Sequence, residues 1–135
     1  MNQIEFVQSL IGLPYVDRAN GPSEFDCWGL FRYVQKNLFS RDLETIISDT
    51  MNIREIAYLF KNHEERKKWR VCEKPTHGGA VEMSHSRHPH HIGIWLDIDG
   101  GAILHCQPSA GVSFDPVLAL KAGGWRRFIY HEWVG

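Results

Sequence analysis

The sequence lacks any long apolar run and any strong excess of charge of one sign. No stretch of roughly eighteen apolar residues occurs, so no membrane-spanning helix is expected. Fifteen basic and sixteen acidic residues give a formal net charge of -1, which supplies no overall field to attract nucleic acid or an anionic lipid surface. We therefore expect neither nucleic acid nor a membrane as a partner.

Cysteine is also scarce, and a leader sequence is not evident. Cys27, Cys72 and Cys106 are an odd number of thiols without CxxC spacing, which excludes a complete disulfide framework and favours a reducing compartment. Residues 1–13 contain no basic cluster followed by an apolar core and a cleavage site, so no signal peptide is expected. The expected location is therefore cytoplasmic.

Length and hydrophobic pattern indicate a single α+β domain over residues 1–135. The chain has 135 residues, of which 43% are hydrophobic, and this is enough for one stable core. Helices are predicted first and an antiparallel sheet second, with the N-terminal helices packed on the sheet. The predicted helices are residues 3–10, 26–39 and 52–70, and the predicted strands are residues 80–83, 91–96, 102–106 and 125–133.

Cys27 stands at the predicted N-terminus of the central helix and is the candidate nucleophile. Apolar residues within 30–38 recur at helical spacing, and Asp26 is a good N-cap. The exposed N–H groups and the helix dipole stabilise an anion there, so we expect a lowered thiol pKa and an accessible sulfur. Iodoacetamide should then label Cys27 faster than Cys72 or Cys106. The alternative is that Cys27 is a small core hydrophobe, as we expect of the other two cysteines.

Two histidines on neighbouring predicted strands supply the candidate base and its partner. Side chains alternate between the two faces of a strand, and an odd connecting loop such as residues 98–100 brings His91 and His105 onto one face. An even loop would separate them. His91 would then take the proton of Cys27 as general base, and His105 would orient the His91 ring. A thiol sealed inside the protein, or one more than about two hydrogen-bond lengths from His91 with no room to close, would overturn this hydrolase interpretation.

A metal site is the alternative for the histidine-rich segment. His85, His88, His90 and His91 could bind zinc or nickel, because neutral imidazoles are common ligands. The H-x-x-H spacing requires a helix, however, and Pro89 disfavours one. No dedicated metal site is predicted.

Together these motifs resemble the NlpC-type cysteine peptidases of the papain-like group. That family carries a Pro-Tyr pair, an Asp-Cys-small-Gly-Leu helix start, a His-apolar-Gly-Ile strand and a polar residue on the next strand. The resemblance covers roughly residues 13–112 in the expected order. It rests on Leu13-Pro14-Tyr15, Asp26-Cys27-Trp28-Gly29-Leu30, His91-Ile92-Gly93-Ile94-Trp95-Leu96 and Ile103-Leu104-His105.

The resemblance implies a papain-like α+β fold and a cysteine endopeptidase with a Cys-His-His triad. Cys27 would attack an amide carbonyl, His91 would be the base and His105 the orienting residue. Tyr15 would line the oxyanion site with the backbone N–H of Cys27. The implied substrate is a peptidoglycan stem peptide, cut next to a D-glutamyl residue and often at its bond to diaminopimelate. No metal or organic cofactor is implied.

Three departures from the family pattern bear on the biological role. Trp28 replaces the usual serine, a form similar to short members that phages and prophages carry as tail assembly or tail-tip proteins. Residues 78–81 stand where the family has a Pro-Gly-Asp-Leu-like run. The segment of residues 40–75 is longer and more helical in pattern than a minimal family core needs. The resemblance thus implies a cytoplasmic protein that joins a phage tail, with tail-tip proteins as partners. The open alternatives are a tail assembly protein with little or no hydrolysis, and the same triad acting on another amide or a thioester.

Overall fold

The structure is a computed structural model that describes residues 2–43, 67–85 and 91–135. Its described helices are α1 (Gln3–Leu10), α2 (Cys27–Phe39) and α4 (Val117–Ala122). Its described strands are β1 (Trp69–Cys72), β2 (Ala80–Ser84), β3 (His91–Leu96), β4 (Ala102–Gln107), β5 (Gly111–Asp115) and β6 (Arg127–Trp133). None of the described helices has the length and apolar character needed to cross a bilayer.

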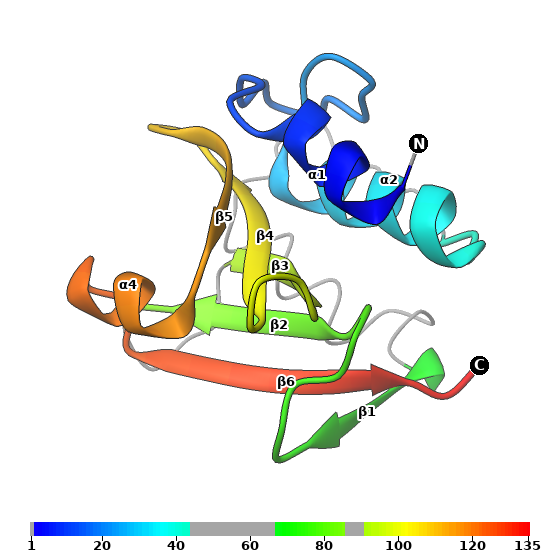
Figure 1. Ribbon diagram of the computed structural model, residues 1–135, viewed down its shortest axis with the longest axis vertical. Coiled ribbons are helices and arrows are strands. Elements are labelled where there is room, and N and C mark those ends of the chain that lie inside the picture. The colour runs from blue at the N-terminus through cyan, green and yellow to red at the C-terminus, as the bar shows by residue number, and fades with distance from the viewer. Residues whose placement is uncertain (1, 44–66, 86–90) are drawn as a thin grey trace.

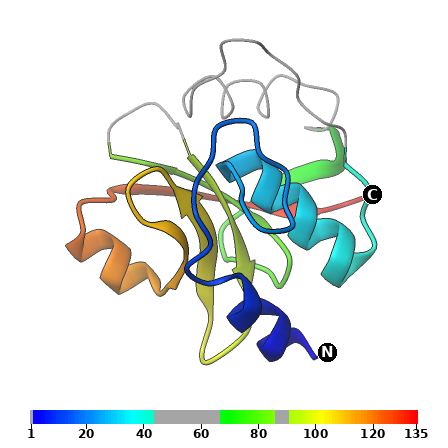
Figure 2. The same cartoon turned by 90° about the horizontal axis from the view of Figure 1, so that it is seen from above.

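The strands form one antiparallel sheet with α1 and α2 on one face. The six-stranded sheet has the order β1-β6-β2-β3-β4-β5. α1 and α2 lie together above one face, and α4 lies to the side, between β5 and β6 in the chain (Figure 1). Figure 2 shows α2 crossing over the strands from above. The predicted α+β class, with N-terminal helices packed on an antiparallel sheet, is confirmed.

Asp26 determines where α2 begins. Its Oδ1 accepts the Gly29 N–H at 2.6 Å, which satisfies one of the N–H groups that a helix start leaves without an intrahelical acceptor. Its Oδ2 accepts the Arg18 N–H at 3.1 Å and so ties the preceding loop to the helix. The predicted helices at residues 3–10 and 26–39 are both confirmed, with Asp26 as the N-cap of the second.

The register of β3 and β4 separates an apolar face from the face that carries the two histidines. Gly93 pairs with His105, and five residues, 97–101, connect the strands. This odd loop places His91 and His105 on the same face, because His91 is two residues before Gly93. The opposite face packs under α2 and contributes Ile92, Ile94, Leu104 and Cys106 to the main core.

Part of the third predicted helix is wrong, and the rest lies outside the described residues. Within residues 52–70, positions 52–66 are not described, and Trp69 and Arg70 begin β1. Trp69 is buried against Phe31, with ring centroids 5.5 Å apart, and opposite Trp133 on β6. This tertiary packing overrides the helix predicted for Trp69 and Arg70.

β5 and α4 were not predicted from the sequence. β5 begins with Gly111 and ends with Asp115, residue types that strands disfavour, and α4 has only six residues, fewer than two helical turns. β5 matters most for the site, because it pairs with β4 and aligns Ser113 with His105.

Candidate active site

Cys27 lies at the junction of α2 and β3. It is the first residue of α2, and its sulfur accepts hydrogen bonds from the backbone N–H groups of Ile92 and Trp28. Ile92 directly follows His91, so the sulfur lies at the same end of β3 as the candidate base. The fold therefore brings Cys27 to the strand that carries His91.

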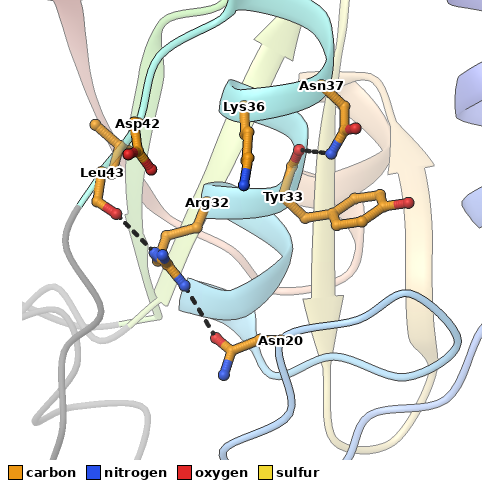
Figure 3. Close-up of a pocket in the computed structure, with 7 residues that line it drawn as sticks. All are labelled: Asn20, Arg32, Tyr33, Lys36, Asn37, Asp42 and Leu43. Carbon is orange, nitrogen blue, oxygen red and sulfur yellow. Dashed lines mark hydrogen bonds between the residues drawn. The ribbon is translucent and has the colours of Figure 1, made fainter.

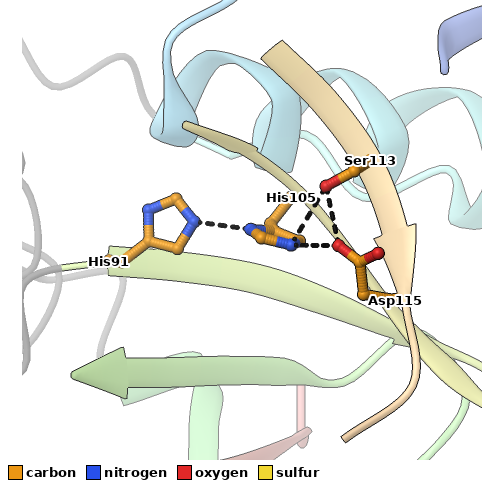
Figure 4. A network of polar contacts seen from close by, with 4 residues as sticks. All are labelled: His91, His105, Ser113 and Asp115. Atoms are coloured by element: carbon orange, nitrogen blue, oxygen red, sulfur yellow. Dashed lines mark hydrogen bonds and ion pairs between the residues drawn. The ribbon is translucent and has the colours of Figure 1, made fainter. Parts of the chain in front are cut away.

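His91 and His105 form the beginning of a chain of polar contacts that extends to β5 (Figure 4). His91 Nε2 lies 2.9 Å from His105 Nδ1. His105 Nε2 lies 2.9 Å from Asp115 Oδ2, and Ser113 Oγ donates to the same carboxylate oxygen at 2.8 Å. Both imidazoles are buried, with 1% of His91 and none of His105 exposed. The Asp115 side chain is 34% exposed, so the chain of contacts runs from the buried imidazoles to a partly exposed carboxylate. The hydrogen bonds among these four residues hold the two imidazoles in one arrangement.

The carboxylate of Asp115 sets the tautomer of each imidazole in this chain. The hydrogen bond from His105 holds the pKa of Asp115 below its usual range, so the ionised carboxylate can only accept. His105 must then carry its proton on Nε2, which leaves Nδ1 to accept the Nε2–H of His91. The remaining ring nitrogen of His91, Nδ1, therefore carries a lone pair and can act as a base.

The predicted activation of the resting Cys27 thiol is wrong. Burial, with 1% of the residue exposed, and the adjacent Asp26 carboxylate raise the pKa of Cys27 well above its ordinary value. The hydrogen bonds from Ile92 and Trp28 lower the pKa but do not compensate for this desolvation. The thiol is thus neutral at rest, and a peptide can reach the sulfur only after the groups that cover it move.

Tyr15 lies near Cys27 in the loop before α2. Its backbone forms an isolated bridge with Phe25, two residues before Cys27. Burial is the largest cause that raises the pKa of Tyr15, and repulsion from the ionised forms of Cys27 and Asp26 adds to it. The phenol therefore stays protonated and can donate a hydrogen bond, which is the property an oxyanion site requires.

The other two cysteines differ from each other. Cys106 is buried in the main core, donates to the Phe25 carbonyl at 3.4 Å and has its pKa raised to about 12 by burial, which confirms its packing role. Cys72 is half-buried at the edge strand β1 and donates to the Lys74 carbonyl at 3.2 Å. The prediction that Cys72 packs as a core hydrophobe is therefore wrong.

The structure reverses the expected order of thiol labelling. We now expect iodoacetamide at neutral pH to modify Cys72 first, because Cys72 is half-buried whereas Cys27 and Cys106 are buried. Desolvation raises the pKa of all three thiols, so access to the sulfur decides the order. Mass analysis of peptides over time measures each rate. A Cys72→Ser variant should lose the fast phase and keep both slow ones. Preferential labelling of Cys27 would contradict the buried, neutral thiol.

Three residues of the site were missed by the sequence analysis: Ser113, Asp115 and Trp125. Ser113 and Asp115 are two residues apart on β5, so the alternation of a strand places them on one face beside His105. A correct strand prediction over residues 111–115 would have found them. The indole of Trp125 is stacked on His91, a contact between residues far apart in the sequence that no local pattern indicates.

The metal alternative shares His91 with the contact chain, and a separate cavity lies along α2. His88 and His90 are outside the described residues, and His85 and His91 both stack on Trp125. A cavity of about 290 Å³ lies along α2 (Figure 3). It is lined by Asn20, Arg32, Tyr33, Lys36, Asn37, Asp42 and Leu43, with Arg32 donating to the Leu43 carbonyl at 2.9 Å. Its lining includes none of the four predicted site residues.

Comparison with known proteins identifies the class. Residues 12–133 match the model of the NlpC/P60 family, and the chain belongs to this family, whose members are cysteine peptidases and amidases. The predicted NlpC-type papain-like fold is thereby confirmed. No protein of curated function matches the sequence.

Solved structures show the same fold at low sequence identity. The NlpC/P60 domain of the peptidoglycan hydrolase SagA is 22% identical, with a TM-score of 0.57 and coverage of 93% of this chain and 92% of that one. NlpC2 from Trichomonas vaginalis is 18% identical, with a TM-score of 0.61 and coverage of 95% and 45%. An N-acetylmuramoyl-L-alanine amidase from Bacteroides uniformis is 11% identical, with a TM-score of 0.52 and coverage of 96% and 97%.

Proposed function

We propose that this protein is a cysteine endopeptidase that hydrolyses an amide bond in peptidoglycan stem peptides, of the D-glutamyl-diaminopimelate type. Membership of the NlpC/P60 family supports the reaction class. The names of two similar structures, a peptidoglycan hydrolase and an N-acetylmuramoyl-L-alanine amidase, support cell-wall amides as the substrate class. The observation that carries the proposal is the chain from His91 through His105 to Asp115, which leaves a lone pair on His91 Nδ1.

The proposed reaction gives a separate role to each of the four predicted site residues: Cys27, His91, His105 and Tyr15. His91 Nδ1 takes the thiol proton while Cys27 Sγ forms a bond to the amide carbonyl carbon. The oxyanion accepts hydrogen bonds from the Cys27 backbone N–H and the Tyr15 hydroxyl. His105 and the Asp115 carboxylate stabilise the resulting imidazolium, which then protonates the leaving amine as the C–N bond breaks. Water, deprotonated by His91, finally hydrolyses the thioester and restores the thiol.

A neutral resting thiol changes how this reaction must begin. Because the pKa of Cys27 is raised by burial, a preformed thiolate-imidazolium pair is not the resting state. Proton transfer must accompany substrate binding, when an amide approaches the sulfur and displaces the groups that cover it. Binding energy from the rest of the stem peptide can supply the cost of that displacement.

Digestion of purified peptidoglycan, followed by mass analysis of the released fragments, tests the proposal. We expect new termini at D-glutamyl residues when the wall contains diaminopimelate, and a matched digestion with a lysine-type wall measures the preference for the third residue. Release at another stem-peptide bond would correct the specificity but keep the endopeptidase class. No thiol-dependent release from either wall would contradict the proposal.

We further propose that the protein acts on a phage or prophage tail, with tail-tip proteins as partners. The support is Trp28 in place of serine, the form similar to phage-borne members. The protein would then be cytoplasmic before assembly and part of the virion afterwards. Quantitative mass analysis of purified virions should find it at a fixed ratio to tail proteins, and its absence from virions that infect normally would contradict this location.

The alternative function is tail assembly, in which the fold serves for docking with little or no hydrolysis. The buried, neutral Cys27 is the specific observation in its favour. Virions that carry Cys27→Ala separate the two functions. Normal assembly with impaired entry into cells supports the peptidase, whereas normal assembly and normal entry supports docking.

A further inference from the structure

Trp125 is held rigidly between α4 and β6, beside the histidine pair. It is 6% exposed and belongs to the smaller core cluster on the face away from α2. The backbone N–H of Trp125 donates to the Leu120 carbonyl at 3.0 Å. The backbone N–H of the next residue, Arg126, donates to the Ser84 carbonyl at 3.0 Å. These two backbone hydrogen bonds fix the place of Trp125 relative to α4 and β2.

The indole of Trp125 contacts three imidazoles. It stacks on His91, with ring centroids 5.2 Å apart and planes at 25°, and it meets His105 edge-on at 6.5 Å and 88°. It also stacks on His85 at 3.9 Å and 21°. His85 is fixed in turn, because its Nδ1 donates to the Gly124 carbonyl at 2.9 Å. Gly124 has φ +103°, a conformation that side chains disfavour, so the turn before Trp125 requires glycine.

We infer that Trp125 is a positioning residue that keeps the ring plane of His91 in register with Cys27. This inference rests on the proposed function. The hydrogen bond to His105 fixes the position of Nε2 of His91. A small rotation of the ring about its Cβ–Cγ bond would still change the direction of the other nitrogen. The flat contact with the indole removes this freedom, so the other nitrogen, Nδ1, keeps one direction.

Two further effects of the indole follow from its chemistry. An aromatic face excludes water from the His91–His105 hydrogen bond, which strengthens that bond because the local dielectric is low. The electron-rich face also stabilises a cation stacked on it, and the proposed reaction forms an imidazolium at His91. Trp125 therefore favours the state that exists after the thiol proton has moved.

Imidazole NMR tests the inference without using hydrolysis as a readout. In the wild-type protein we expect His91 in the Nε2–H tautomer, with that proton slow to exchange with water. Trp125→Leu should raise its exchange rate by at least roughly tenfold, because the cover over the hydrogen bond is lost. Trp125→Phe retains a flat ring and should stay within about threefold of wild type.

Trp95 provides a matched control for the loss of a large aromatic side chain. It packs against the same core cluster, but its ring meets Tyr130 edge-on and its indole N–H donates to Asp97 at 2.7 Å, away from His91. Trp95→Leu should therefore leave the His91 exchange rate at its wild-type value. The inference is overturned if Trp125→Leu leaves His91 exchange unchanged, or if Trp95→Leu accelerates it equally.

Kinetics on a stem peptide provide the second readout. Trp125→Leu should lower kcat by roughly tenfold with little change in KM, because the ring is needed when the proton moves and not for substrate binding. Trp125→Phe should restore most of kcat. A wild-type protein without hydrolysis would remove the proposed function, while the NMR result would still decide whether Trp125 positions His91. A roughly tenfold rise in KM with kcat unchanged would overturn the positioning role.

Discussion

Cys27→Ala should abolish hydrolysis of stem peptides while the protein remains folded. The side chain supplies the only proposed nucleophile, so we expect a loss of roughly four orders of magnitude or more in kcat. The free energy of unfolding should change by about 1 kcal/mol or less, because one buried sulfur is lost and the helix cap at Asp26 remains. Peptide release by mass analysis and thermal unfolding measure the two effects.

Cys106→Ala is the matched control for Cys27→Ala. Cys106 is also a buried thiol in the main core, but it lies on the face of β4 opposite His105. This variant should keep its kcat and show a comparable change in melting temperature. Wild-type activity in Cys27→Ala would refute the nucleophile, and equal losses in both variants would indicate a general effect of core packing.

Asp115→Asn should lower kcat by about a thousandfold with KM nearly unchanged. An asparagine amide can donate to His105 Nε2, which permits the other tautomer and takes the Nδ1 acceptor away from His91. The geometry of the chain is retained, so the loss comes from the position of protons. Steady-state kinetics and the ring nitrogen shifts of His105 provide the measurement.

The same variant should change how stability depends on pH. The pKa of Asp115 is lowered in the folded protein, so its carboxylate stabilises the fold above the unfolded pKa of about 4, and this contribution is lost as pH falls through the lower folded value. Asp115→Asn should lack this part of the acid destabilisation in urea titrations. Ser113→Ala is the milder control, because His105 keeps its bond to Asp115. Wild-type kinetics in Asp115→Asn would contradict the tautomer argument.

Local rules account for the parts of the site that the sequence predicted correctly. The Asp26 cap and the start of α2 depend on neighbouring residues alone. The shared face of His91 and His105 depends on whether one short loop is odd or even, and the hairpin satisfied the odd case. Their direct contact follows from that register.

The errors arose where packing between distant segments decides the outcome. The pKa of Cys27 depends on burial, which a helix-dipole argument cannot estimate from sequence. Asp115 ends a strand that begins with glycine, and both residue types are depleted in strands. Trp125 lies between α4 and β6 in the chain yet stacks on His91 of β3. Trp69 joins a strand because Trp133 and Phe31 offer an aromatic surface. The roles of Cys27, His91, His105 and Tyr15 stay predictions until the variants are measured.

Asp26 has two opposed effects through one carboxylate. It accepts the N–H groups of Gly29 and Arg18, and so joins the helix start to the loop before it. Its negative charge is also the second cause that opposes ionisation of the neighbouring sulfur. Folding and reactivity are therefore antagonistic at this residue: the fold gains an anchored helix and the nucleophile loses acidity.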